Sequence, residues 1–142
     1  MGAYTEKSTV TPSLAGLTPY APPGDLSPRS RTSYAWDPQW PVKPDVVFEG
    51  GNLLSDGVAT WREPALSLLT TGHDVTRAHL TEFTDTSAAT ALAAQLAANI
   101  YADQPTRWPE TVRGLMVHSA EWTPAMRARL GRNTMQEKVD VL

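Results

Sequence analysis

Residues 85–101 read DTSAATALAAQLAANIY, and the composition of the chain changes abruptly where this stretch begins. Leu92, Leu96 and Ile100 recur every four residues, and alanines at positions 89, 93 and 97 lie beside them. This spacing predicts a helix with one small, apolar face that can pack closely against a sheet or another helix. We expect the helix to end near residue 101.

The first residues of this helix are candidates for chemistry as well as for capping. Asp85, Thr86 and Ser87 are all good N-cap residues, and capping is the favoured interpretation of these three residues alone. A serine at a helix start also lies beside unpaired amides and the positive end of the helix dipole. Such amides can stabilise an oxyanion, so the position also suits an acyl-transfer nucleophile.

Other elements are predicted on both sides of this helix. Residues 44–51 read PDVVFEGG, which predicts a buried strand feeding a loop, and residues 66–70 predict a second strand closed by Gly72. Residues 73–84 are interpreted as a possible hairpin arm. Downstream, Pro109 suits the first turn of a second helix, and a short third helix is expected near Pro124.

Composition limits the classes of function. The 142 residues fit one domain or a piece of one, and the absence of cysteine excludes disulfides, cysteine catalysis and thiolate metal sites. A net charge of -3 argues against a nucleic-acid partner, and no apolar run is long enough for a membrane span. We therefore expect neither nucleic acid nor membrane as a partner, while a cytoplasmic or a secreted location stays open.

A family resemblance begins at the start of the helix. The stretch TSAATA, residues 86–91, resembles the Gly-Thr-Ser-x-Ala-Thr/Ser-Pro motif around the nucleophile of subtilisin-like serine proteases, the subtilases of peptidase family S8. Four more segments resemble that family in the same order along the chain: residues 2–3, 26–30, 43–51 and 104–113. Together they make the chain similar to the C-terminal part of a subtilase catalytic domain, in a bacterial branch with Glu-Gly-Gly-Asn in place of Ala-Pro-Gly.

The resemblance implies a fold and an activity. The fold is α/β, a three-layer arrangement with a mainly parallel sheet, of which residues 1–142 are one segment holding the last strands and helices. The activity is that of a serine endopeptidase with Ser87 as its nucleophile, and the amide of Ser87 supplies one oxyanion donor. No metal and no organic cofactor are implied. The partners are a peptide or protein substrate and the missing N-terminal half of the catalytic domain.

The remaining catalytic groups are expected elsewhere. Subtilases carry the triad Asp and His, and a side-chain oxyanion donor, ahead of a Val-Gly-Ala strand that reads Met1-Gly2-Ala3 here. We therefore expect the reading frame to extend upstream of Met1 and this chain alone to be inactive. Three departures from the family pattern are Asp85 for Gly, Ala91 for Pro and Gln95 for Gly. A carboxylate at residue 85 would oppose an oxyanion unless it points away as a helix cap.

Rival sites within the chain are weaker. A hydrolase using His118 with Ser87 would need a Gly-x-Ser-x-Gly elbow, which is missing, so His118 is interpreted as a surface or half-buried helix residue. His73 and His79 fit no metal-ligand spacing. Glu49 and Glu63 are predicted to make turn or loop hydrogen bonds rather than an acid/base pair.

Several side chains receive no catalytic role. The arginines near the C-terminus are interpreted as a solvated helix end: Arg127, Arg129 and Arg132. No oxyanion role is transferred to Asn52, Asn99 or Asn133. The tryptophans are predicted to be core and loop anchors: Trp36, Trp40, Trp61, Trp108 and Trp122. The alternative to a protease is a non-catalytic interaction module, or the remnant of a decayed gene, with a protease-derived fold.

Overall fold

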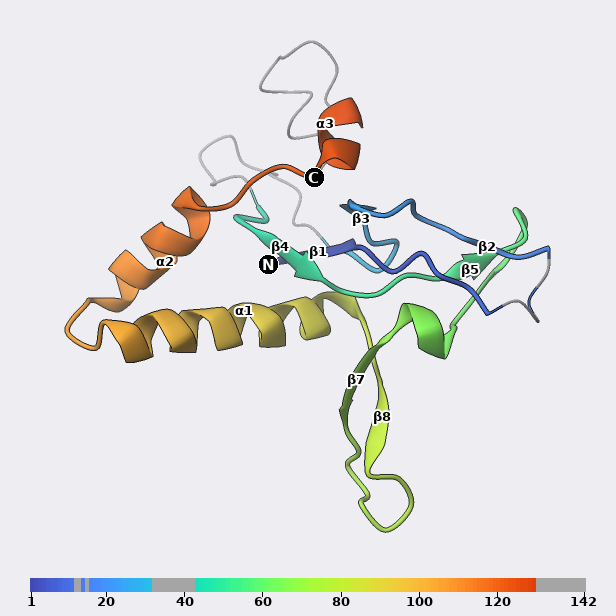
Figure 1. Cartoon of the computed structure of the whole chain (residues 1–142), viewed down its shortest axis with the longest axis horizontal. Helices are drawn as coiled ribbons and strands as arrows, with labels where there is room; N and C mark the ends of the chain where they lie inside the picture. The colour runs from blue at the N-terminus through green and yellow to red at the C-terminus, as the bar shows by residue number, and fades with distance from the viewer. Residues whose placement is uncertain (12–13, 15, 32–42, 130–142) are drawn as a thin grey trace.

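The computed structural model describes residues 1–11, 14, 16–31 and 43–129 (Figure 1). Strands and helices alternate irregularly along these residues, and most strands are short. The strands are β1 (Gly2–Thr5), β2 (Thr18–Pro19), β3 (Asp25–Leu26), β4 (Val47–Glu49), β5 (Leu54–Ser55), β6 (Thr60–Trp61), β7 (Leu68–Thr71) and β8 (Leu80–Phe83). The helices are α1 (Asp85–Asp103), α2 (Pro109–His118) and α3 (Pro124–Arg129), with a 3₁₀ turn at Pro64–Leu66.

The described strands form three small sheets. In the first, β1 lies between β3 and β4, antiparallel to β3 and parallel to β4, with Ala3 opposite Phe48. In the second, β5 lies between β2 and β6, and both pairs are antiparallel. The third is the antiparallel hairpin of β7 and β8, which projects away from the rest of the chain in Figure 1.

The predicted mixture of strands and helices is confirmed, but the expectation of a mainly parallel sheet is not what the described residues show. Only the β1–β4 pair is parallel among the strand pairs described here. The reason is the length of the connections. The four residues between β5 and β6 can only join antiparallel strands, whereas 41 residues separate β1 from β4 and allow a parallel crossover.

Helix α1 covers one face of the first sheet, lying along β4 and β1 (Figure 1). Its contact surface includes the buried residues Ala88, Ala89 and Ala93, whose small side chains allow the helix axis to approach the strands closely. The predicted small apolar face is confirmed at Ala89 and Ala93, whereas Leu96, which was predicted on the same face, is 37% exposed. The helix runs two residues beyond the expected end, to Asp103.

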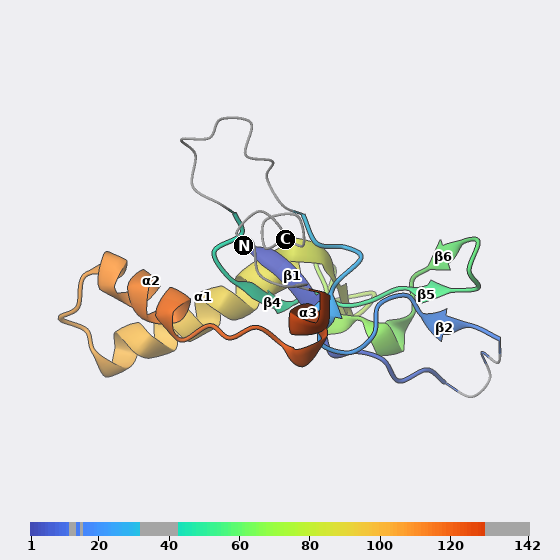
Figure 2. The ribbon, with the colours of Figure 1, turned by 90° about the horizontal axis from the view of Figure 1, so that it is seen from above.

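Helix α2 begins at Pro109, as predicted, and packs beside α1 with Val112 buried. The short helix α3 was also predicted; it packs on β3, and its residue Met126 is buried. In Figure 2, α1 and α2 lie at one end of the chain and β2, β5 and β6 at the other. No helix in the described part of the chain is long and apolar enough to cross a membrane.

One arginine near the C-terminus differs from its predicted solvated role. Arg129 forms an ion pair with Asp25, whose side chain is 1% exposed, and thereby ties α3 to β3. The hydroxyl of Thr123 adds a second link by donating to the carbonyl of Gly24. Arg127 remains exposed and reaches Glu121 at 3.9 Å.

Two other predictions need correction. The strand predicted over residues 44–51 is half-buried rather than buried, because one side of β4 faces α1 while its outer edge has no partner strand among the described residues. Trp61 and Trp108 are 44% and 76% exposed, so they are not core anchors. Trp122 is half-buried. The predictions for Trp36, Trp40, Arg132 and Asn133 lie outside the described residues.

The hairpin prediction is confirmed. Residues 68–71 form β7, close to the predicted second strand, and the segment after Gly72 returns as β8. The turn between them is held by the carboxylate of Asp74, which accepts from the amide of Thr76 at 3.1 Å. Strand β8 leads directly into α1, so this hairpin positions the start of the helix.

Candidate active site

Ser87 is the third residue of α1, and its side chain is exposed. The helix is capped at Thr84 without any side-chain hydrogen bond, so Ser87 does not act as the cap. Within the described part of the chain, the Ser87 hydroxyl makes no hydrogen bond. The first amides of a helix have no partner within the helix, so this hydroxyl lies at the end of α1 where amides are left without an intrahelical acceptor.

The loop after β4 contacts the first residue of α1 directly. The amide of Asp85 donates to the carbonyl of Gly50 at 2.8 Å. A Cβ atom on Gly50 would lie 2.5 Å from the Cβ of Ala3 and 3.1 Å from the carbonyl oxygen of Asp85. Gly51 has a φ of 82°, and a Cβ there would lie 3.1 Å from Cγ2 of Thr84. Both glycines are therefore required by the close approach of the helix.

Asp85 carries an unusual backbone and a charged partner. Its φ of 73° lies in the left-handed region, which favours glycine over other residues. Its carboxylate accepts two hydrogen bonds from Arg29, one from Nε and one from Nη2 at 3.0 Å. This hydrogen bond raises the pKa of the Arg29 guanidinium above its ordinary value. The negative charge next to Ser87 is thus matched by a cation.

Ser27 joins the segments that surround the helix start. Its hydroxyl, in a side chain 4% exposed, donates to the carbonyl of Gly51 at 2.6 Å and accepts from the amide of Arg29 at 3.1 Å. Its amide donates to the carbonyl of Ala3 at 3.1 Å, and the amide of Ala3 donates to the hydroxyl of Ser30 at 3.0 Å. Three of the five segments behind the family resemblance, residues 2–3, 26–30 and 43–51, are therefore hydrogen-bonded to one another beside the start of α1.

Asn52 has a structural role. Its side chain is 1% exposed, and its Nδ2 donates to the carbonyls of Lys7 and Ala21 at 2.9 and 2.8 Å. Its Oδ1 accepts from the amides of Ala21 and Leu53. All polar atoms of this side chain are satisfied within the protein, which leaves none for an oxyanion.

The two glutamates weighed as an acid/base pair make the predicted loop hydrogen bonds. The carboxylate of Glu49 accepts from the amides of Gly51 and Glu6 at 2.8 and 2.7 Å. The carboxylate of Glu63 accepts from the amide of Ala65 at 3.4 Å, at the start of the 3₁₀ turn. Glu49 thus fixes the loop that supports α1.

The histidines do not come together with Ser87. His118 is the exposed last residue of α2, in agreement with its predicted place on the helix surface. His73 and His79 are exposed around the turn between β7 and β8. In the described ranges, no hydrogen bond joins a histidine to Ser87, and no cluster of three potential metal ligands occurs.

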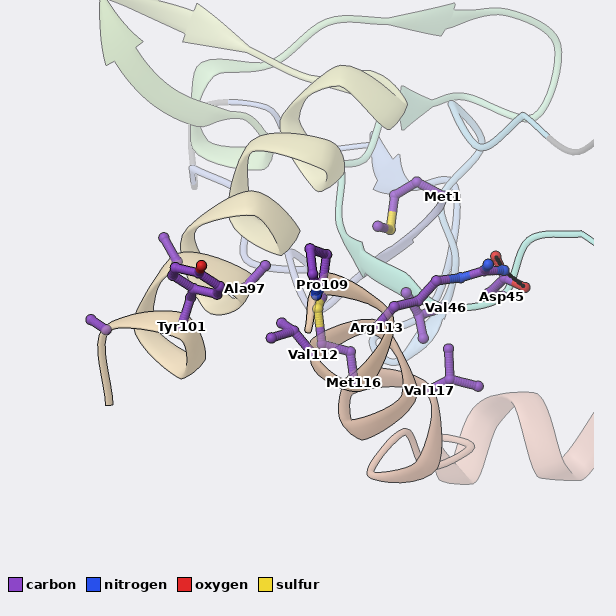
Figure 3. Close-up of a pocket in the computed structure, with 12 residues that line it drawn as sticks. Met1, Asp45, Val46, Ala97, Tyr101, Pro109, Val112, Arg113, Met116 and Val117 are labelled. Carbon is purple, nitrogen blue, oxygen red and sulfur yellow. Dashed lines mark hydrogen bonds and ion pairs between the residues drawn. The ribbon is translucent and has the colours of Figure 1, made fainter. Parts of the chain in front are cut away.

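A cavity among the described residues lies away from the start of α1. It measures about 640 Å³ and opens between the second half of α1, α2 and the start of β4 (Figure 3). Tyr101, Val112 and Met116 contribute to its largely apolar wall, and the ion pair of Arg113 with Asp45 lies at its edge. Ser87 and Arg29 do not line it, so this cavity is separate from the candidate active site.

The sequence did not lead us to predict that Arg29 binds the Asp85 carboxylate. The sequence signal that could have prompted a search for a cation is the carboxylate of Asp85 two residues before the candidate nucleophile. Arg29 lies 56 residues earlier, in the segment that resembles a family turn, and nothing in the spacing distinguishes it from the other basic residues.

The described residues place an exposed serine in the first turn of α1, against a glycine loop and a parallel strand pair. The model of the subtilase family matches residues 1–139. The chain therefore belongs to the subtilase family, peptidase S8, as the resemblance predicted. No curated protein matches the chain, and no solved structure matches it either.

Proposed function

We propose that Ser87 is the nucleophile of a subtilisin-like serine endopeptidase. The observation that carries this proposal is the exposed Ser87 hydroxyl at the first turn of α1, in a chain that matches the subtilase family over residues 1–139. The base histidine, the aspartate that orients it and the side-chain oxyanion donor belong to polypeptide outside residues 1–142. The chain is the C-terminal segment of the catalytic domain.

The reaction is acyl transfer. The Oγ of Ser87 attacks the carbonyl carbon of the scissile peptide bond while the base histidine takes its proton. The amide of Ser87 stabilises the resulting oxyanion. The histidine then gives the proton to the departing amine, which leaves an acyl-enzyme ester. Water, deprotonated by the same histidine, hydrolyses this ester and regenerates the Ser87 hydroxyl.

The complete enzyme has a three-layer α/β fold with a mainly parallel sheet. Two observations favour this: β1 and β4 are parallel, and α1 covers the face of their sheet. The outer edge of β4 has no strand beside it in the described ranges, so further parallel strands can add there. Peptide substrates bind extended, partly through main-chain hydrogen bonds.

The test is reconstitution. The segment carrying the base histidine is supplied as a separate polypeptide, and hydrolysis of casein and of short peptides is measured with each half and with the mixture. We expect activity only in the mixture, its loss in Ser87→Ala, and its retention in the matched control Ser119→Ala. Activity that survives Ser87→Ala, or a mixture without activity, would refute the proposal.

The second candidate is an interaction module, or a gene remnant, that keeps a protease-derived fold without catalysis. A partner could contact the exposed apolar side chains that the described residues present at separate places: Val58 is 96% exposed, Leu69 68% and Trp108 76%. The reconstitution separates the two candidates. Tight association of the halves without hydrolysis would support the module, whereas neither association nor hydrolysis would support the remnant.

A further inference from the structure

The turn before Ser87 holds a residue that is costly in two ways. Asp85 has a φ of 73°, a backbone conformation that costs a non-glycine residue free energy. It also carries a negative charge only two residues before Ser87, where acyl transfer would develop further negative charge. The Cα atoms of residues 85 and 87 are at most about 7.6 Å apart, since consecutive Cα atoms are separated by 3.8 Å.

Arg29 compensates for both costs. Its Nε and Nη2 both donate to the Asp85 carboxylate, a fork geometry that fixes the orientation of the two side chains. The side chains are only about one third exposed, at 31% and 37%. The backbone of Arg29 is itself held, because its amide donates to the hydroxyl of Ser27, which is buried.

The arginine is connected to the helix start by a second route as well. The Ser27 hydroxyl donates to the carbonyl of Gly51, and the preceding carbonyl, that of Gly50, accepts from the amide of Asp85. The backbone and the side chain of Asp85 are therefore both tied to the same pair of loops. This closed set of contacts defines one conformation for the residue two positions before Ser87.

We propose that Arg29 is a positioning residue that acts through its two hydrogen bonds to the Asp85 carboxylate. These bonds fix the left-handed turn that presents Ser87, and the guanidinium neutralises the negative charge that would oppose the oxyanion. The neutralisation of charge during catalysis rests on the proposed function of Ser87. The fixing of the turn is a property of the chain by itself, and it is measurable without activity.

The first experiment measures amide hydrogen exchange of residues 84–88 in the full 142-residue chain. We expect Arg29→Gln to speed this exchange about fivefold, the effect of losing a partly exposed ion pair, and Arg29→Lys to give an intermediate rate. The matched control is Arg77→Gln, which removes the exposed ion pair with Asp74 on the hairpin and should leave residues 84–88 unchanged. Equal exchange in wild type and Arg29→Gln would overturn the positioning role.

The second experiment measures kcat and KM of the reconstituted enzyme. We expect Arg29→Gln to lower kcat about tenfold with little change in KM, because an unmatched carboxylate two residues before Ser87 acts on the transition state. Adding Asp85→Asn to Arg29→Gln should restore much of kcat, since asparagine tolerates the left-handed turn and carries no charge. A purely structural role predicts no rescue, and that result would overturn the charge argument.

The two experiments distinguish a failure of the proposed function of Ser87 from a failure of the positioning role of Arg29. If the reconstituted wild-type enzyme has no activity, the proposed function fails, and with it the charge argument, while the exchange of residues 84–88 still decides whether Arg29 fixes the turn. If the enzyme is active and Arg29→Gln changes neither exchange nor kcat, the proposed function stands and this inference falls.

Discussion

Gly50 offers the sharpest single test of how the candidate nucleophile is held. This residue lies where the loop after β4 touches both β1 and the start of α1. In Gly50→Ala, the added Cβ would lie 2.5 Å from the Cβ of Ala3 and 3.1 Å from the carbonyl oxygen of Asp85. The first distance is far inside van der Waals contact, so the loop or the helix must move.

The cost follows from what can move. Ala3 is fully buried in the central strand of its sheet, and the carbonyl of Gly50 accepts the amide of Asp85 at 2.8 Å. Neither contact is with the flexible end of a long side chain. We therefore expect Gly50→Ala to lower the free energy of unfolding by about 1–3 kcal/mol, the usual cost of overpacking a filled site.

A matched glycine in the same chain gives the control. Gly114 lies inside α2, and a Cβ there would meet nothing within 4 Å. Gly114→Ala should raise the free energy of unfolding by about 0.5–1 kcal/mol through helix propensity. Urea unfolding followed by circular dichroism at 222 nm measures both variants. If Gly50→Ala is as stable as wild type, the close contact between the loop and α1 is wrong.

Three further predictions concern the supporting structure. Asn52→Ala should lower the free energy of unfolding by about 2–4 kcal/mol. It leaves the buried amide and carbonyl of Ala21 without hydrogen-bond partners, and each such group costs roughly 1–3 kcal/mol. An unchanged urea midpoint would contradict this prediction. Met126→Ala, at a side chain 2% exposed, should cost about 2–5 kcal/mol in the same assay, and a surface-like effect would show that α3 is not docked. The hydrogen bond from Lys43 lowers the pKa of Asp45, so its stabilisation is present above the unfolded carboxyl pKa of about 3.9 and is lost as the pH falls through the lower folded value. Asp45→Asn, which removes the carboxylate itself, should therefore destabilise the chain by at most about 1 kcal/mol at pH 7, and this effect should shrink as the pH falls through the folded carboxyl pKa; an effect that does not change with pH would refute this explanation.

The sequence predicts the helices of this fold well. The four-residue spacing of Leu92, Leu96 and Ile100 predicts α1, and prolines mark the first turns of α2 and α3. These signals are local, since helix periodicity and capping depend on neighbouring residues. The hairpin of β7 and β8 also follows from nearby residues, with Gly72 at its bend.

Sheet pairing and the charged partners depend on long-range packing, and there the sequence falls short. Strands of two to four residues carry too little pattern to set a direction. The mainly parallel sheet was expected from the family resemblance alone, and most of the described pairs are antiparallel. The links from Arg29 to Asp85 and from Arg129 to Asp25 join residues 56 and 104 positions apart. A chain with 12 basic residues offers too many possible pairs for spacing to select these.

The central claim is that Ser87 is a nucleophile, and covalent labelling tests it most directly. The reconstituted enzyme is treated with a biotinylated fluorophosphonate, digested and analysed by tandem mass spectrometry. The account predicts a phosphonyl adduct on Ser87, found only when both halves are present and absent from Ser87→Ala. An adduct on another residue, or none on Ser87 in the reconstituted enzyme, would contradict it.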